Sequence, residues 1–296
     1  MAARIIDGTK IAAQVRQEVA AGIVALKEQT GVTPGLAVVL VGENPASQSY
    51  VRNKNKAAHE IGMYSEQHNL PESTTESELL ALVKTLNHDP RINGILVQLP
   101  LPAAIDEQKV IDAIAPDKDV DGFHPISLGR IMTGQTGFRP CTPLGIQRLL
   151  TEAGVKIPGS HVVVVGRSNI VGKPIANMLM QKEENADATV TLCHSHTRDL
   201  PSITRQADIL IAAIGKPLFV TADMVRDGAV VIDVGINRIA DPGHPRGQRM
   251  VGDVKFDEVS LKASAITPVP GGVGPMTIAM LLSNTLQSAR ASAARK

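Results

Sequence analysis

The segment His161-Val-Val-Val-Val165-Gly166-Arg-Ser-Asn-Ile-Val-Gly172-Lys-Pro174 decides how the second half of the chain folds. The run of valines predicts a buried strand, and the glycine that follows it predicts a tight turn. Pro174 suits the first turn of a helix, where its missing N–H costs nothing. A strand, a glycine turn and a helix N-terminus together form a setting in which backbone N–H groups hold a phosphate. The segment therefore predicts a nucleotide-binding unit.

The glycine spacing departs from the general fingerprints for such units. Ser168 takes the second position of G-x-G-x-x-G, and Gly172 falls one residue late. A P-loop does not fit either, because five residues separate the glycines and Pro174 stands where the magnesium-binding Ser or Thr belongs. ATP hydrolysis is therefore disfavoured. The alternative to nucleotide binding is a turn in which the glycines only relieve backbone strain.

Buried strands and helices alternate through the rest of this half. That alternation is typical of a doubly wound, mainly parallel sheet, entered near residue 145. The predicted strands are His161–Val165, Thr189–His194, Ile209–Ala213 and Val230–Val234, with a helix over Pro174–Met180. The Gly-rich stretch Pro268–Pro275 and an amphipathic helix over Met276–Ala291 follow.

The end of the strand after the glycine turn indicates which nucleotide binds. It reads Cys193-His-Ser-His-Thr197 and offers no Asp or Glu, the residue type that holds the ribose 2′-hydroxyl of NAD. Arg167 and Ser195 are candidates for contact with a 2′-phosphate, which predicts NADP. His194 and His196 are expected on one face of this strand, but no third ligand accompanies them, so we predict no metal site.

The first half of the chain also reads as an α/β unit. Thr75, with Glu78 three residues later, forms a capping-box pattern ahead of an apolar helical run. The other predicted elements are a helix over Thr9–Gln29, a strand over Leu36–Val41, a helix over Ala46–Ile61 and a strand over Gly94–Leu99.

Lys54 is the candidate for chemistry in this half. Helical spacing puts it on the same face as Tyr50 and Ala58, among residues that should point inward. Burial would lower its pKa and leave an amine that accepts a proton near neutrality. The alternative is a lysine whose stem lies along the apolar face while its charge reaches water.

Two further polar residues stand where ligands bind. Gln98 is the one polar side chain in an apolar strand and lies at its carboxyl end, where open α/β sheets bind ligands. The sequence Asp117-Lys-Asp-Val-Asp121-Gly122 resembles the opening of a calcium loop, but Leu128 replaces the bidentate Glu at its twelfth position, so calcium is rejected. Asp121 is left as an acceptor in a tight turn.

The composition argues against several classes of partner. A length of 296 residues fits two domains, and a net charge of +1 disfavours duplex nucleic acid and membrane surfaces. Four Phe, two Tyr and no Trp are too few for a platform that stacks single-stranded bases. The N-terminal residues lack a secretory pattern and no long apolar run occurs, which predicts a cytoplasmic protein.

Six segments, taken in order, resemble one family, the bifunctional methylenetetrahydrofolate dehydrogenases/methenyltetrahydrofolate cyclohydrolases. These segments are Ser49–Lys56, Val97–Pro102, Asp117–Gly122, Pro140–Pro143, Gly166–Pro174 and Pro268–Thr277. The resemblance covers essentially the whole chain, and the late glycine is the form that this family uses. It implies oxidation of 5,10-methylenetetrahydrofolate with NADP, then hydrolysis of 5,10-methenyltetrahydrofolate to 10-formyltetrahydrofolate, within one-carbon metabolism and purine biosynthesis.

The resemblance also implies a role for each candidate residue. Lys54 matches the catalytic lysine and Gln98 the glutamine hydrogen-bonded to it. Tyr50 matches a tyrosine that packs on the folate, and Asp121 a carboxylate that binds the amino and ring N–H groups of the pterin. The matching loop that closes over the folate contains Pro270, Gly271 and Gly272. The positions that match the cofactor site are Gly166, Arg167, Ser168, Ser195 and Ile236.

The implied architecture is α/β with two domains and an active-site cleft between them. Residues 1–143 and 277–296 would form the catalytic domain, and residues 144–276 a Rossmann-like doubly wound NADP-binding domain. Members of the family are usually homodimers built on the nucleotide domain. His196 is a departure, because relatives commonly carry Arg or Lys there, and a second phosphate contact would then be absent or depend on pH.

Two other functions remain open from the residues alone. Another two-domain NADP dehydrogenase, of the shikimate or amino-acid type, would use Lys54 as its own catalytic lysine. A dinucleotide-sensing module without turnover would explain the glycine turn and leave Lys54, Gln98 and Asp121 unexplained.

Overall fold

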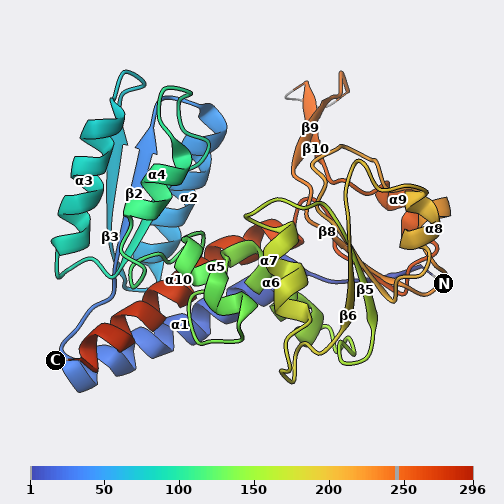
Figure 1. Ribbon diagram of the computed structural model, residues 1–296, viewed down its shortest axis with the longest axis horizontal. Coiled ribbons are helices and arrows are strands. Elements are labelled where there is room, and N and C mark those ends of the chain that lie inside the picture. The colour runs from blue at the N-terminus through green and yellow to red at the C-terminus, as the bar shows by residue number, and fades with distance from the viewer. Residues whose placement is uncertain (1, 244–246, 296) are drawn as a thin grey trace. The chain divides into compact units, whose positions relative to one another are not determined.

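The structure is a computed structural model that describes residues 2–243 and 247–295 (Figure 1). Within these residues the chain divides into two compact units. One contains the residues up to Ala12 together with Thr142–Thr277, and we call it the glycine-turn unit. The other contains Ala13–Cys141 together with the residues from Ile278, and we call it the lysine unit.

The glycine-turn unit is built on a parallel six-stranded sheet, which confirms the predicted α/β class. The strand order is β1-β11-β8-β7-β5-β6. The strands are β1 (Arg4–Ile5), β5 (His161–Val165), β6 (Thr189–Cys193), β7 (Ile209–Ala212), β8 (Val230–Asp233) and β11 (Ala265–Ile266).

The order of these strands explains where a ligand would bind. From β5 the chain passes to β6 on one side and then returns to β7 on the other side. The order therefore reverses at β5, and open α/β sheets bind ligands at the carboxyl ends of the strands beside such a switch point. Gly166 follows β5 at that edge.

Helices and a hairpin accompany this sheet. The helices are α6 (Cys141–Glu152), α7 (Gly172–Leu179), α8 (Leu200–Thr204) and α9 (Phe256–Val259), with a 3₁₀ turn η1 (Ala222–Met224). The hairpin pairs β9 (Asn237–Ala240) with β10 (Gln248–Val251). This hairpin was not predicted, because both strands are largely exposed and lack the apolar pattern that burial imposes.

The lysine unit contains a smaller parallel sheet in the order β3-β2-β4. Its strands are β2 (Gly35–Val41), β3 (Tyr64–Leu70) and β4 (Gly94–Val97). Every residue of β2 and β4 is buried, as the apolar runs predict. Its helices are α2 (Pro45–Glu60), α3 (Glu76–His88), α4 (Glu107–Ala113) and α5 (Pro125–Met132).

Two long helices each contribute part of their length to this unit. They are α1 (Gly8–Thr30) and α10 (Val273–Ala293), and Figure 1 shows them running alongside one another. A Cβ at Gly22 of α1 would lie 2.6 Å from a methyl carbon of Leu286 in α10. Glycine at this position therefore lets the two helices approach closely.

The capping box predicted for α3 is confirmed. The Thr75 hydroxyl accepts the N–H of Glu78 at 3.3 Å, and the Glu78 carboxylate accepts the N–H of Thr75 at 2.8 Å. Both bonds satisfy donors that have no partner within the helix, so this local pattern fixes where α3 begins.

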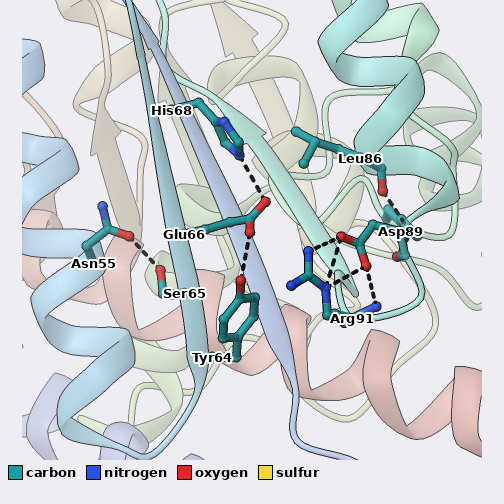
Figure 2. Close-up of polar contacts among 9 residues, drawn as sticks. Asn55, Tyr64, Ser65, Glu66, His68, Leu86, Asp89 and Arg91 are labelled. Atoms are coloured by element: carbon teal, nitrogen blue, oxygen red, sulfur yellow. Dashed lines mark hydrogen bonds and ion pairs between the residues drawn. The ribbon is translucent and has the colours of Figure 1, made fainter.

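Strand β3 was not predicted, because its sequence Tyr-Ser-Glu-Gln-His-Asn-Leu is polar. It lies at the edge of the sheet, where one neighbouring strand is enough to order the backbone. Its side chains bond one another and the preceding helix α2 (Figure 2). Glu66 accepts hydrogen bonds from Tyr64 at 2.8 Å and pairs with His68 at 2.9 Å, and Ser65 bonds Asn55 of α2.

The compact units differ from the predicted domain division at the N-terminus. Residues up to Ala12 lie with the glycine-turn unit rather than with residues 13–141. The physical reason is that β1 pairs in parallel with β11, Arg4 opposite Ala265, and this pairing adds β1 to the six-stranded sheet. A strand of two residues is too short to be recognised from the sequence. The division into domains 1–143 plus 277–296 and 144–276 stays a prediction.

None of the helices in the described residues combines the length and the hydropathy that crossing a membrane requires.

Candidate active site

Lys54 is the centre of the site in the lysine unit. It lies in the third turn of α2 and only 7% of its surface is exposed. Its Nζ donates a hydrogen bond to Oε1 of Gln98 at 3.0 Å. The expectation of an inward-pointing lysine is confirmed, and the alternative of a stem that carries the charge to water does not hold.

Gln98 is held in the orientation that suits this lysine. It follows β4 directly, and its backbone N–H donates to the Val39 carbonyl of β2 at 2.8 Å. Its side-chain Nε2 donates to the Leu99 carbonyl at 2.7 Å. Because the amide nitrogen is occupied, the amide oxygen faces Lys54 and only the lysine can donate in their bond.

Helix α2 is anchored on its other side by Asn55. This residue is buried, and its side-chain oxygen accepts the Ser65 hydroxyl of β3 (Figure 2). Its side-chain nitrogen donates to Gln67 of the same strand. Because β3 was not predicted, the second buried face of α2 could not be seen in the sequence. The anchor fixes the rotation of α2 and thereby the direction of Lys54.

The electrostatics of the site follow from burial. Burial lowers the pKa of Lys54 below its ordinary 10.5, while the nearby Asp121 and Cys141 oppose that decrease. Burial also raises the pKa of Asp121, against the stabilising charge of Lys54 and a hydrogen bond from Cys141. The pKa of Cys141 is raised well above its ordinary value by burial and by Asp121. The site thus favours a neutral amine and a protonated thiol.

Sequence reasoning missed Asp119, which shapes the turn that carries Asp121. Asp119 is 2% exposed, and its carboxylate accepts the N–H groups of Gly122 and Phe123 at 3.2 Å each and of His124 at 2.9 Å. It also accepts the Ser127 hydroxyl at 2.7 Å. Burial raises the pKa of Asp119 to about 6. The available signal was a second acid two residues before Asp121, which the rejected calcium pattern obscured.

The other predicted folate-binding residues are distributed differently. Tyr50 lies one helical turn before Lys54 in α2, with 37% of its surface exposed. Pro270, Gly271 and Gly272 belong to the glycine-turn unit, where the Gly271 carbonyl accepts the N–H of Thr9 at the start of α1 at 3.1 Å. Within the lysine unit the structure therefore brings together Lys54, Gln98 and Asp121.

The glycine turn in the other unit is a tight backbone structure. A side chain at Gly172 would overlap the Gly166 carbonyl, and one at Gly166 would overlap the Ala213 carbonyl after β7. Gly166 also has φ +128°, a conformation that side chains disfavour. Ser168 Oγ accepts the N–H groups of Val171 at 3.1 Å and Gly172 at 3.3 Å. The turn thus leads directly into α7, two residues earlier than predicted.

The remaining cofactor candidates lie at the surface of this unit. Arg167, Ser168 and Ser195 are exposed, and Ile236 is 47% exposed and adjoins Gly274, whose added Cβ would lie 3.7 Å from Ile236 Cδ1. Exposed side chains beside a tight glycine turn are available to hold a ligand. Arg167 and Ser195 follow β5 and β6, the two strands on one side of the switch point, and the turn after β6 contains no carboxylate.

The expectation that His194 and His196 share a strand face is wrong. Strand β6 ends at Cys193, because the Thr197 hydroxyl accepts the N–H of His194 at 2.8 Å and closes a turn. The N–H of His196 then donates to Nδ1 of His194 at 3.2 Å, and the rings stand edge to face. Nδ1 of His194 is thereby occupied as an acceptor, which leaves Nε2 as its donor.

Comparison with known proteins places this geometry in context. The chain matches the family models described as tetrahydrofolate dehydrogenase/cyclohydrolase, catalytic domain, over residues 6–121, and NAD(P)-binding domain, over residues 140–293. It is 60% identical over 291 residues to the bifunctional protein FolD of Dehalococcoides mccartyi (strain CBDB1), with 98% of each chain covered.

Solved structures agree with these matches. The crystal structure of the bifunctional FolD enzyme from Campylobacter jejuni superposes with a TM-score of 0.92 at 50% identity, covering 98% of this chain and 99% of that one. FolD of Trypanosoma brucei, solved with NADP cofactor and inhibitor, superposes with a TM-score of 0.93 at 40% identity and 99% coverage of both chains.

Proposed function

The chain belongs to the tetrahydrofolate dehydrogenase/cyclohydrolase family, and we propose that it carries out both reactions of the family name in succession. It oxidises 5,10-methylenetetrahydrofolate with NADP and hydrolyses the resulting 5,10-methenyltetrahydrofolate to 10-formyltetrahydrofolate. High identity over nearly the whole chain favours this function over a shikimate-type or amino-acid dehydrogenase and over a sensing module without turnover.

The observation that carries the proposal is the buried Lys54 bonded to Gln98. A surface lysine would be charged and would repel a cationic intermediate. A desolvated lysine with a lowered pKa is neutral more often, accepts a proton and adds little positive charge. This combination suits a reaction that passes through a folate cation.

In the dehydrogenase step the protein's task is alignment. NADP, when bound, accepts the hydride that leaves the methylene carbon. The glycine turn fits such a dinucleotide, because its backbone leaves no room for side chains at Gly166 and Gly172 and presents the start of α7. Arg167, Ser168, Ser195 and Ile236 are the residues that would hold it, with Arg167 and Ser195 facing the 2′-phosphate. Holding both reactants in place converts a bimolecular reaction into an intramolecular one.

In the hydrolytic step Lys54 acts as a base. Water adds to the cationic methenyl carbon, and Lys54 Nζ takes the proton that the water loses, directly or through a second water. Gln98 keeps the amine in place through its acceptor oxygen. The bond between this carbon and N5 of the folate then breaks, and N5 gains a proton as the new hydroxyl group loses one, which gives the 10-formyl compound. The lysine returns the proton that it took to solvent.

Folate binding is assigned to residues around this amine. Asp121 accepts the amino and ring N–H groups of the pterin in a bidentate pair, and its position beside Lys54 supports that assignment. Tyr50, one turn from Lys54, packs on the folate ring. Pro270, Gly271 and Gly272 are assigned to substrate binding because the resemblance to the family implies that role.

The assembly and location of the protein are part of the same proposal. We infer a homodimer built on the glycine-turn unit, as the resemblance to the family implies, and sedimentation at micromolar concentration would measure its mass. Cytoplasmic location remains a prediction.

One spectrophotometric assay tests the function. The protein is mixed with 5,10-methylenetetrahydrofolate and either NADP or NAD, and the near-ultraviolet absorbance of the methenyl compound is followed with that of the reduced nucleotide. We expect faster reduction of NADP than of NAD, and loss of the methenyl absorbance as hydrolysis proceeds. No folate-dependent reduction, or turnover of shikimate in its place, would overturn the proposal.

A further inference from the structure

Two buried acids of the glycine-turn unit have no role in the mechanism above. Asp233 ends β8 and is 3% exposed, and Asp253 is fully buried. Burial raises the pKa of Asp233 to about 7, and the nearby Asp253 adds to the increase. Within the part of the chain that the structure describes, neither carboxylate has a cationic hydrogen-bond partner. Burial of two adjacent carboxylates costs stability, so we expect them to serve a function of the protein.

Among the described residues, the Asp233 carboxylate accepts hydrogen bonds from backbone N–H groups alone. Its Oδ1 accepts Gly235 at 3.0 Å and Asp253 at 2.8 Å, and its Oδ2 accepts Val254 at 3.0 Å. The backbone at Gly252 lies so close that a side chain there would overlap the carboxylate. Asp233 therefore ties the segment that leads to Ile236 to the segment that carries Asp253.

Asp253 continues this chain of bonds to the glycine turn. Its Oδ2 accepts the N–H groups of Ile214 and Gly215, both at 2.8 Å, and its Oδ1 accepts the side-chain amide of Asn237 at 2.9 Å. Ile214 and Gly215 follow Ala213, whose carbonyl lies directly against Gly166. The two acids thus connect the ends of β7 and β8 at the edge where the cofactor is proposed to bind.

We propose that Asp233 and Asp253 are positioning residues for the dinucleotide. They hold the Ala213–Gly215 and Gly235–Asn237 segments in the form that receives it, without touching the cofactor themselves. The assignment rests on the proposed NADP site. It predicts that these acids govern NADP affinity and the dehydrogenase step, while methenyl hydrolysis, which uses no hydride acceptor, is unaffected.

The acids differ in how they tolerate an amide, and this difference is the sharpest test. In Asp253→Asn the new oxygen still accepts Ile214 and Gly215, and its NH₂ group faces Asn237, which satisfies it by turning its own amide over. In Asp233→Asn the new NH₂ group faces a backbone N–H whichever way it turns. Removal of Asp253 by alanine leaves all three of its donors unpaired.

The experiment is direct titration of NADP into the purified full-length variants, with methenyl hydrolysis measured on the same samples. We expect the Kd for NADP to rise at least about tenfold in Asp253→Ala and Asp233→Asn, and by no more than about threefold in Asp253→Asn. Hydrolysis should stay within about twofold of wild type. Asp241→Asn is the control, because Asp241 also accepts a backbone N–H, from Gly243 at 3.1 Å, but lies near the surface.

The proposal is overturned if a folded Asp253→Ala variant binds NADP like wild type, if Asp253→Asn is as damaging as Asp253→Ala, or if hydrolysis falls by the same factor as NADP affinity. If Asp253→Ala and Asp233→Asn do not fold, the proposal is tested by amide hydrogen exchange on the wild-type protein without NADP. The Gly215 N–H lies in an exposed loop and donates to Asp253, so the proposal requires that it exchange slowly. Rapid exchange at Gly215 would refute the positioning role of Asp253. NADP is titrated without folate, so this measurement does not depend on folate turnover. A protein that binds NADP but does not turn over folate would contradict the proposed function, while the titration would still test the role of the two acids.

Discussion

Lys54 and Arg167, the basic residues proposed to act in the two units, differ in their exposure to water. Lys54 is 7% exposed and hydrogen-bonded to Gln98, whereas Arg167 is an exposed residue of the glycine turn. Burial gives the lysine a lowered pKa and so makes it a candidate base. An exposed guanidinium keeps its charge, and such a group is suited to recognising a phosphate. The lysine unit therefore suits the proposed proton transfer, because it buries the amine. The glycine-turn unit suits the proposed binding of a phosphate, because it exposes a charged side chain beside a tight backbone turn.

Substitution of Lys54 by methionine is expected to give the largest effect. General base catalysis contributes about 10²- to 10⁴-fold, so cyclohydrolase kcat should fall by that factor. The dehydrogenase step needs alignment rather than proton transfer and should fall less. Steady-state assays of both steps measure the ratio. Lys56→Met is the matched control, since Lys56 is an exposed neighbour in the same helix that pairs with Glu60 at 3.8 Å. Equal loss of both activities in Lys54→Met would show that the lysine only positions the substrate.

Substitution of Asp121 by alanine tests the binding role within the lysine unit. Loss of a charge-assisted pair with the pterin should cost about 1.5 to 3 kcal/mol, which is roughly 10- to 150-fold in folate KM. The Kd for NADP, measured by titration, should not change. Asp117→Ala is the control, because Asp117 lies in the same turn but pairs at the surface with Arg295 at 2.6 Å. Weakened NADP binding with an unchanged folate KM would contradict the pterin assignment.

Substitution of Arg167 by alanine is the corresponding test in the glycine-turn unit. If Arg167 bonds the 2′-phosphate, the variant should bind NADP more weakly by about 1.5 to 3 kcal/mol. NAD lacks that phosphate, so its Kd serves as the internal control and should stay near the wild-type value. If the affinities for NAD and NADP fall together, the assignment of Arg167 to the 2′-phosphate is wrong. Arg167 would then support the fold or bind the part that the two nucleotides share.

The pH dependence of stability gives the smallest expected effect. Because the pKa of Lys54 is lowered on folding, the unfolded chain binds more protons between that lowered pKa and 10.5. The free energy of unfolding should therefore rise with pH through this window, by at most about 1.4 kcal/mol per pH unit from this residue. Urea unfolding of wild type and Lys54→Met at several pH values measures the difference, and Lys54→Met should lack this contribution. Parallel pH profiles would mean that Lys54 is charged in the folded protein.

The strands with apolar runs could be predicted from the sequence because burial imposes its pattern locally. Strand β5 has the predicted bounds, and β7 and β8 each end one residue earlier. Strand β3 and the β9–β10 hairpin could not be predicted in this way. These strands form because their backbones pair with a neighbouring strand. Backbone pairing does not require a particular pattern of polar side chains, so the sequence does not reveal it.

The residues of the candidate site also differ in whether the sequence could identify them. Helical spacing alone pointed Lys54 inward, and the strand end marked Gln98, so both could be found without coordinates. Asp119, Asp233 and Asp253 could not, because an isolated acid in a sequence does not reveal that backbone N–H groups from other segments surround it. Each is identified only by its partners in the fold.

What the amino-acid sequence determined by itself was the alternation of strands and helices, the glycine turn at Gly166–Gly172, and the set of motifs that fix the family. These are short-range features, set by residue type and spacing within a few turns of the chain. Tertiary structure alone decided the membership of β1 in the six-stranded sheet and the convergence of Asp233 and Asp253 on the ends of β7 and β8. The reason is that burial and hydrogen bonding depend on which distant segments meet, and residue spacing carries no record of that meeting.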